Sequence, residues 1–462
     1  MILVSTLCFL LALLLPHLAV AAVGIRRGGP TDVFSPLRVL TFLGLSTVPY
    51  LVILCFDVGR LSREVWLSPW VPDVPAGIAR YVMLSSVAYL VMVLGLFAPA
   101  GDWIARRLPV LHERRFTPAR CRRAFFLCAG AGLVAYGWFL HQIGGLRRLW
   151  VHMALRTDLL AGQGYLFNLY TLLLTFAPLV LVYSLRFERS RRRVAAAVLT
   201  VVAAAAILAS TGGRMGAITL ALYAFMTAHY GVRRLRRLVT RWTVLIVAVL
   251  MVFFTALPLF RTEGAFEVYS ENPDLLARQV GRSFGHVAWQ FSSLDRGLVI
   301  TGYFTPDRLW WGRSYGDLLA APVPRRGFRD KPPVDEGVYV TALAYGNHVR
   351  PPTPARLLPA TSWPPGNWAL YMNFGVPGLL CGMYLAGIGI AAAYRYMWAS
   401  GFTPLSIYLY GYTVLGGMGF SNYLIVQGIV TVTMAALVFV PLFGRWPWPA
   451  PARAPARAEG AA

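Results

Sequence analysis

One feature recurs along most of this chain: runs of about 20 mostly apolar residues, separated by short polar loops. An α-helix needs a run of that length to cross the hydrocarbon core of a bilayer. The sequence therefore predicts an all-α integral membrane protein with about eleven transmembrane helices. The predicted spans are 2–23, 36–56, 80–99, 124–142, 165–185, 193–210, 214–231, 242–260, 368–394, 403–419 and 422–443.

The composition agrees with a membrane protein. Hydrophobic residues make up 57% of the chain and charged residues only 13%, whereas soluble domains are about 25% charged. The net charge of +24 comes almost entirely from arginine, since Lys331 is the only lysine. In a soluble protein such a charge would suggest nucleic acid. Short cytoplasmic loops of membrane proteins carry the same excess, so no nucleic-acid partner is expected.

The arginine-rich loops set the predicted orientation. Loops 101–123, 186–193 and 232–241 all fall on one side of an eleven-span topology, together with the C-terminal tail. Because basic residues concentrate in cytoplasmic loops, the C-terminus is predicted inside and the N-terminus outside. Residues 1–22 lack the positive start of a cleavable signal peptide, so we expect a retained first span.

One long segment, 261–367, faces the opposite side. It holds ten of the nineteen acidic residues and twelve basic residues, a mixture typical of a folded cap rather than a tether. The predicted organisation is therefore a membrane part over 1–260, the cap over 261–367 and further spans over 368–443. The tail, 444–462, is rich in proline, alanine and arginine and is predicted to be disordered.

An amphipathic helix is predicted inside the cap. Asn272, Pro273 and Asp274 favour a helix start, because Asn is a good N-cap, Pro suits the first turn and an acid complements the helix dipole. Polar residues then recur every four positions and share a face: Arg278, Arg282, His286 and Gln290. These arginines either meet lipid headgroups and the cap's own acids, or bind phosphate oxygens through their planar fork.

More arginines lie where predicted spans meet the outer surface, against the usual charge bias: Arg156, Arg214, Arg261, Arg325 and Arg326. Arg214 follows Gly213 at the tip of a tight predicted hairpin. An anionic substrate at the outer leaflet would explain several of these charges together.

Motifs of soluble enzymes are absent from the sequence. It contains no H-E-x-x-H, P-loop, G-x-S-x-G elbow or C-x-x-C. The five cysteines have no spacing that suggests disulfides or a zinc site. We therefore expect no metal and no cofactor.

Several short segments resemble a known family, the bacterial O-antigen polymerases (Wzy-type oligosaccharide repeat-unit polymerases). The resemblance extends over most of the chain and depends on the order and spacing of its motifs. Those motifs are Asp32 to Leu37, Ile143 to Leu146, Arg156, Gly162 to Tyr165, Ser210 to Arg214, Pro324 to Arg326, Lys331 with Pro332, and Asn373 to Gly378.

The resemblance implies a metal- and nucleotide-independent glycosyltransferase on the extracytoplasmic face of the bacterial cytoplasmic membrane. It would transfer a growing glycan from polyprenyl pyrophosphate to a new lipid-linked unit, in the biosynthesis of O-antigen or another surface exopolysaccharide. The implied partners are lipid-linked oligosaccharides and the bilayer, with a chain-length regulator and a flippase as protein partners.

The implied site is cationic. Arginines of the large outer loops matter in the family, so the resemblance assigns them to the leaving pyrophosphate: Arg156, Arg214, Arg261, Arg278 and Arg282, followed by Arg325, Arg326 and Lys331. Cations aimed at developing negative charge stabilise a transition state. The acceptor hydroxyl needs a general base, for which His286, Asp335 and Glu336 are candidates.

Two other functions stay open at this stage. A ligase, or another polyprenyl-linked glycosyltransferase, shares this architecture and chemistry but uses a different acceptor. A polysaccharide or lipid transporter is less favoured, because such proteins place charges in mid-membrane and often show repeats, whereas the predicted spans are almost free of charge.

Overall fold

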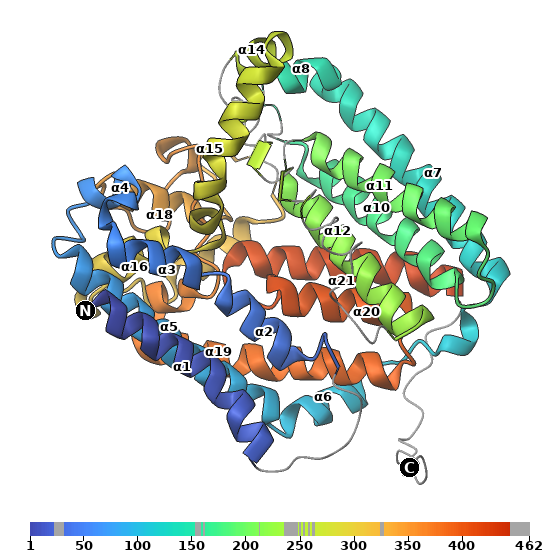
Figure 1. Ribbon diagram of the computed structural model, residues 1–462, viewed down its shortest axis with the longest axis horizontal. Coiled ribbons are helices and arrows are strands. Elements are labelled where there is room, and N and C mark those ends of the chain that lie inside the picture. The colour runs from blue at the N-terminus through green and yellow to red at the C-terminus, as the bar shows by residue number, and fades with distance from the viewer. Residues whose placement is uncertain are drawn as a thin grey trace.

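The computed structural model is helical throughout the part of the chain that it describes (Figure 1). The described residues are 1–22, 32–152, 159, 162–211, 213–234, 248, 251–252, 255–256, 259–260, 264–323 and 328–443, with the backbone alone at 214, 281–287, 290 and 417. No strand occurs among them. The predicted all-α class is therefore confirmed for these residues.

Nine helical segments are long and apolar enough to cross a membrane within the described ranges. They are α1 (Ile2–Ala22), α2 with α3 (Pro36–Leu45 and Val48–Phe56), α5 (Val74–Phe97), α7 (Pro118–Ile143), α10 (Gly164–Ser184), α11 (Arg191–Ser210), α12 with the π-turn η4 (Arg214–Thr227 and Ala228–Val232), α19 (Trp368–Ala399) and α21 (Asn422–Phe443). This number supports an α-helical membrane protein.

The two remaining predicted spans have different outcomes. Span 242–260 lies largely outside the described residues. Span 403–419 is shorter than predicted: α20 (Pro404–Tyr412) continues only as the π-turn η10 (Thr413–Gly417). The chain leaves the helix there because Gly416 adopts a φ of 117°, a conformation that glycine reaches without steric cost.

The helices form two bundles. In the first, α5 packs along both α1 and α19, and the short helix α6 (Ala100–Arg107) lies against α19. Backbones touch where α5 meets α19: a Cβ on Gly95 would lie 2.2 Å from the carbonyl oxygen of Tyr384, and one on Gly387 would lie 2.0 Å from that of Met92. Small residues permit such close helix packing in membranes.

The second bundle is built around α10, which packs on α7, α11 and α12. Helices α20 and α21 complete it and join it to the first bundle through the contact of α20 with α19. Its core is aromatic, with Phe176, Tyr183 and Phe439 fully buried.

Two helices connect the bundles at one edge of the molecule. α15 (Pro273–Phe291) begins at the residue that the sequence predicted, although the side chain of Asn272 donates to the carbonyl of Val268 instead of capping the helix. α15 contacts α3 in the first bundle, and α14 (Ala265–Glu271) contacts α8 (Leu146–Val151) beside the second (Figure 1).

A compact cap covers the first bundle at the end where α1 begins. It contains α16 (Leu294–Tyr303), α17 (Arg313–Gly316) and α18 (Gly337–Ala344). Figure 1 shows α16 and α18 together with α4 (Arg63–Leu67). Its core joins Trp310, Tyr339 and Leu343 to α19 residues such as Met372. We call this the capped end.

The arginine-rich loops meet at the opposite end. Arg186 forms an ion pair with Glu113 at 2.6 Å, and Arg120 donates to the carbonyl of Phe443. Arg234 lies over the ring of Trp398. These contacts gather the described parts of the arginine-rich loops at one end of the molecule.

Candidate functional site

A buried carboxylate lies where the cap meets the membrane helices. Glu336 is 0% exposed. Its Oε1 accepts a hydrogen bond from the Ser314 hydroxyl at 2.8 Å, and its Oε2 accepts one from the backbone amide of Asn422 at 2.8 Å. One side chain therefore ties α17 and α18 to the first residue of α21.

A break in α19 provides the docking point for the cap. Gly375 is non-helical there, with a φ of 66°, and Pro377 follows it. Proline has no N–H to bond the carbonyl four residues earlier. The freed carbonyls of Met372 and Asn373 instead accept hydrogen bonds from the amides of Trp310 and Trp311, at 3.0 and 2.9 Å.

The side chain of Asn373 completes this junction. Its Nδ2 donates to the Ser314 hydroxyl at 2.8 Å, and its Oδ1 accepts from the Gly312 amide at 3.1 Å. Asn422 donates through Nδ2 to the Ser314 carbonyl. We call Glu336, Ser314, Asn373 and Asn422 the Glu336 network; all four side chains are buried.

Burial changes the acidity of the carboxyl groups in the cap. It raises the pKa of Glu336 to about 7, against the opposing effect of its hydrogen bonds. It also raises the pKa of Asp317 to about 6, although the Tyr339 hydroxyl donates to that group at 3.0 Å. Asp335 is half-buried and accepts from the Gly337 amide and the Ser362 hydroxyl.

An elongated cavity of about 320 Å³ lies below the cap, between α1, α2, α5 and α19. Its lining on α5 runs from Tyr81 to Met92, which is about 16 Å of helical rise. The walls are largely apolar, with Phe9 from α1 and Leu379 from α19 among them. Leu43 at its rim is 37% exposed, so the cavity adjoins the apolar surface that the spanning helices offer to lipid.

The end of the cavity nearest the cap is polar. It is lined by Ser293, Arg296 and Asn367. Arg296 donates to the Ser293 hydroxyl and forms no ion pair with any described residue. The Oδ1 atom of Asn367 is buried and has no hydrogen-bond partner within the described ranges.

The acid next to Arg296 in the sequence is held by other groups. Asp295 accepts a hydrogen bond from the Trp289 indole at 2.5 Å and one from the Tyr50 hydroxyl at 3.3 Å. Burial raises the pKa of Asp295 despite these donors. Asp295 acts on Arg296 electrostatically but forms no ion pair with it. Arg296 thus lies at the head of an apolar cavity, where an anionic group on a lipid chain could bind.

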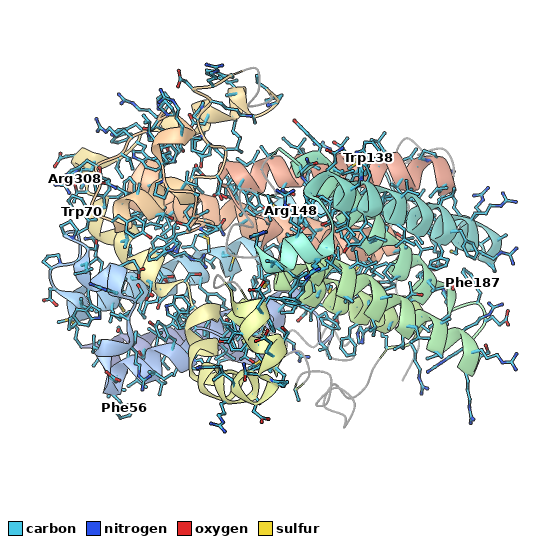
Figure 2. The ribbon with its side chains drawn as sticks, turned by 90° about the horizontal axis from the view of Figure 1, so that it is seen from above. Phe56, Trp70, Trp138, Arg148, Phe187 and Arg308 are labelled. Atoms are coloured by element: carbon cyan, nitrogen blue, oxygen red, sulfur yellow. The ribbon has the colours of Figure 1, made fainter. Side chains whose placement is uncertain are left out.

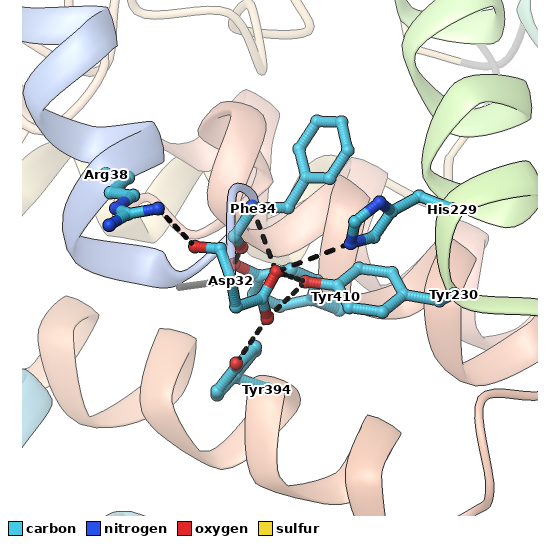
Figure 3. A network of polar contacts seen from close by, with 7 residues as sticks. All are labelled: Asp32, Phe34, Arg38, His229, Tyr230, Tyr394 and Tyr410. Atoms are coloured by element: carbon cyan, nitrogen blue, oxygen red, sulfur yellow. Dashed lines mark hydrogen bonds and ion pairs between the residues drawn. The ribbon is translucent and has the colours of Figure 1, made fainter. Parts of the chain in front are cut away.

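A second buried carboxylate lies toward the other end of α19 (Figure 3). Asp32 precedes α2 and accepts hydrogen bonds from the hydroxyls of Tyr230, at 2.7 Å, and Tyr394, at 2.5 Å. His229 Nε2 lies 3.7 Å from its Oδ1, and the Tyr410 hydroxyl donates to the Phe34 carbonyl. This Asp32 network ties the α1–α2 connection to α12, α19 and α20.

The structure describes the side chains of only some of the predicted site residues. Glu336 and Asp335 lie together in the cap, and Arg278 is exposed on α15. Lys331 donates to the carbonyls of Ala321 and Val323, so it takes part in the internal hydrogen bonding of the cap.

The other predicted residues are not described at side-chain level. Arg282 and His286 belong to α15 and Arg214 begins α12, and their side chains lie outside the described part. The predictions for Arg156, Arg261, Arg325 and Arg326 fall outside the described residues altogether.

Sequence reasoning did not single out Arg296, Ser314 or Asn422, and it named Asn373 only as the first residue of a motif that carries the family resemblance. One signal pointed to Arg296: it sits beside Asp295 in the otherwise apolar segment Leu294–Tyr303. Nothing local marks the Glu336 network, because its hydrogen bonds join residues that are 22 to 108 positions apart in the chain. In the described residues, no group of three or more His, Cys, Asp or Glu side chains could hold a metal ion.

Comparison with known proteins adds no relative. The chain matches no protein-family model, no curated protein and no solved structure.

Proposed function

We propose that this protein is a membrane glycosyltransferase that polymerises lipid-linked oligosaccharide repeat units. The growing glycan is transferred from polyprenyl pyrophosphate to a new lipid-linked unit, at the capped end, on the extracytoplasmic side of the bacterial cytoplasmic membrane. The supporting observation is the apolar cavity with Arg296 at its head. Such a site suits a substrate with a long hydrocarbon chain and an anionic headgroup.

The chemistry assigns a role to each part of this site. An acceptor hydroxyl oxygen attacks the anomeric carbon of the donor, the bond from that carbon to the pyrophosphate oxygen breaks, and the proton passes to a base. Polyprenyl pyrophosphate leaves with its added negative charge. Arg296 stabilises that charge, as cations aimed at a leaving group do, and Arg278 and Arg282 of α15 add to it.

The acids of the cap fit different roles. Both oxygens of Glu336 already accept hydrogen bonds, so we assign it a positioning role that holds the cap on α19 and α21. Asp335 is the more accessible carboxylate. Together with His286 it remains a candidate for the base that accepts the hydroxyl proton.

One observation favours transport as a second candidate. Both α19 and the α20–η10 helix are interrupted, at Gly375 and Gly416, and discontinuous helices often build substrate sites in transporters. Vectorial movement of a lipid-linked glycan by the reconstituted protein, with no chain growth, would establish this alternative.

The test is complementation of a gene deletion in the host. Loss of the high-molecular glycan ladder, with single repeat units on their final anchor, supports polymerisation. Long chains that persist on the lipid carrier would instead identify a ligase. An unchanged ladder in the deletion strain would refute the proposal.

The same strain tests the cationic site. We expect Arg296→Gln and Arg282→Ala to lower polymer yield about tenfold or more, with protein abundance changed less than about twofold. Arg329→Gln is the matched control, because Arg329 is an exposed cap arginine outside the cavity. Equal yields in all three variants would remove Arg296 and Arg282 from the site.

A further inference from the structure

A separate pocket opens at the outer surface of the cap. It encloses about 300 Å³ and is lined by Tyr303, Arg308, His348 and Arg350. These residues come from the end of α16 and from the segments that follow α16 and α18. The volume lies at the lower limit of ligand pockets, which run from about 300 to 1,000 Å³, so it suits one small group.

Aromatic rings hold one arginine of this pocket in place. The guanidinium carbon of Arg308 lies 5.3 Å from the ring centre of Trp70 and 5.5 Å from that of Tyr303. Figure 2 shows Arg308 and Trp70 at the same end of the molecule. A guanidinium stacked on rings keeps its N–H groups at the edge available for a bidentate acceptor.

The Trp70 ring that stacks on Arg308 is itself held in place by its own contacts. The Trp70 indole donates to the carbonyl of Leu343 at 2.9 Å. Its ring packs edge-on against Tyr303, with ring centres 5.0 Å apart, and against His348, at 4.6 Å. A pre-organised cation loses less conformational entropy when it binds a ligand.

The pocket presents positive charge alone. No acid lines it, and neither Arg308 nor Arg350 forms an ion pair with a residue in the described ranges. Elsewhere on the cap, Arg356 is paired with Asp330 at 2.9 Å. A neutral ligand would leave both charges without a counter-charge, so the ligand is expected to be an anion.

The pocket lies apart from Arg296, where we propose that the phosphate of the lipid binds. Tyr303 ends the helix that carries Arg296 near its start, and seven residues of helix correspond to about 10 Å. The two pockets also have no lining residue in common, so they are separate sites. The glycan attached to that phosphate extends beyond it, and the pocket lies on the cap along the same helix.

From these features we infer that the pocket binds the carboxylate of an acidic sugar in the lipid-linked glycan. The carboxylate sits between Arg308 and Arg350, with His348 and Tyr303 as further hydrogen-bonding groups. The inference rests on the proposed function and specifies its substrate class: repeat units that contain a uronic acid or a similar carboxylated sugar.

Binding to the purified full-length chain in lipid nanodiscs tests this inference without any transfer reaction. The probes are methyl glucuronoside and its neutral counterpart methyl glucoside, followed by ligand-detected NMR. We expect the glucuronoside to bind at least tenfold more tightly than the glucoside. Arg308→Gln and Arg350→Gln should each weaken it about tenfold, and Arg329→Gln should leave it unchanged.

Two results would overturn the inference: equal binding of the two glycosides, or glucuronoside binding that both pocket variants retain. Competition with inorganic phosphate and pyrophosphate tests whether the pocket binds a phosphate group instead of a sugar carboxylate. If either displaces the glucuronoside at a lower concentration than the glucuronoside itself requires, the pocket is a phosphate site and the acidic-sugar assignment fails.

The deletion experiment separates this outcome from a failure of the proposed function. Selective glucuronoside binding with an unchanged polymer ladder would refute polymerisation and leave an acidic-glycan binding protein. A lost ladder without glucuronoside binding would leave the polymerase and refute the acidic substrate.

Discussion

Two buried carboxylates, Asp32 and Glu336, lie toward opposite ends of α19, and their environments lead to opposite protonation behaviour. On α19, Tyr394 donates to Asp32, and Asn373 bonds Ser314, which donates to Glu336; Tyr394 and Asn373 are separated by roughly 30 Å of helical rise. Burial would raise the pKa of Asp32, but hydrogen bonds from His229, Tyr394, Tyr230 and the Phe34 amide lower it. Burial of Glu336 outweighs its two donors and raises its pKa to about 7.

The difference lies in the number of donors and in their chemistry. Asp32 is surrounded by phenol hydroxyls and an imidazole, which stabilise a carboxylate. Glu336 accepts hydrogen bonds from one serine hydroxyl and one backbone amide, and it is fully buried. The lowered pKa keeps Asp32 charged at neutral pH, whereas the raised pKa of about 7 allows Glu336 to bind a proton near neutral pH.

The largest expected effect on stability comes from removing the Asp32 carboxylate. Asp32→Ala removes the carboxylate that accepts from Tyr230 and Tyr394 and lies beside His229, so we expect a loss of roughly 3–5 kcal/mol in unfolding free energy. Thermal unfolding in detergent, followed by intrinsic fluorescence, measures it. Asp330→Ala is the control, since its ion pair with Arg356 is exposed and contributes about 1 kcal/mol at most. Similar melting of the two variants would contradict a structural role for Asp32.

The second prediction concerns pH. A carboxyl whose pKa is raised in the folded state keeps its proton after the unfolded chain has lost it. The contribution of Glu336 is therefore complete below its ordinary pKa of 4.5 and is lost as the pH rises to about 7, a change of at most about 3 kcal/mol. Glu336→Gln should flatten the decline in melting temperature between these pH values. A decline of the same slope in the variant would show that another group titrates.

For Asp32, stability changes with pH in the opposite direction, and it does so over a different pH range. Its pKa is lowered in the folded state, so its stabilisation is present above the ordinary pKa of 3.8 and is lost as the pH falls below that value. Melting curves of Glu336→Gln at acidic pH measure the contribution of Asp32 without that of Glu336. A melting temperature that does not change with pH in this acidic range would mean that Asp32 and Glu336 do not differ in the way their protonation affects stability.

A smaller effect is expected at the break in α19. Asn373→Ala removes the side-chain bonds to Ser314 and Gly312, which we expect to lower stability by about 2 kcal/mol. Limited proteolysis of the cap, compared with the wild type, would detect local release of residues 310–316. Unchanged cleavage would show that the backbone bonds of Trp310 and Trp311 are sufficient to hold the cap.

The smallest effect is predicted for a single donor of the Asp32 network. Tyr394→Phe removes one hydrogen bond to a carboxylate that retains others, at a loss of about 1.5 kcal/mol. Its melting temperature should lie between those of the wild type and Asp32→Ala. A loss as large as that of Asp32→Ala would mean that Tyr394 alone sustains the network.

Much of the secondary structure followed from the sequence. Apolar length is a local property, so it located the spans that the structure describes as helices. The start of α15 was equally local, since Pro273 fits a first helical turn. The early end of α20 was missed because span 403–419 was predicted from apolar length alone, whereas the non-helical backbone of Gly416 interrupts the helix there.

The candidate site was accessible to sequence reasoning only in part. Arginines and acids of the cap were identifiable by type, and Glu336 was among them. Its burial, the docking of Trp310 and Trp311 on α19, and the position of Arg296 at a cavity were not readable, because each depends on contacts between distant segments.

By itself, the sequence determined that this chain is helical and membrane-embedded, through runs of apolar residues whose backbone must satisfy its own hydrogen bonds in lipid. Only the tertiary structure decided which polar residues meet. Asp32 and Tyr394 are 362 residues apart, and Glu336 and Asn422 are 86 apart. The physical reason is that helix formation is local, whereas burial and hydrogen-bond partners, which set charge and reactivity, are fixed by how the helices pack.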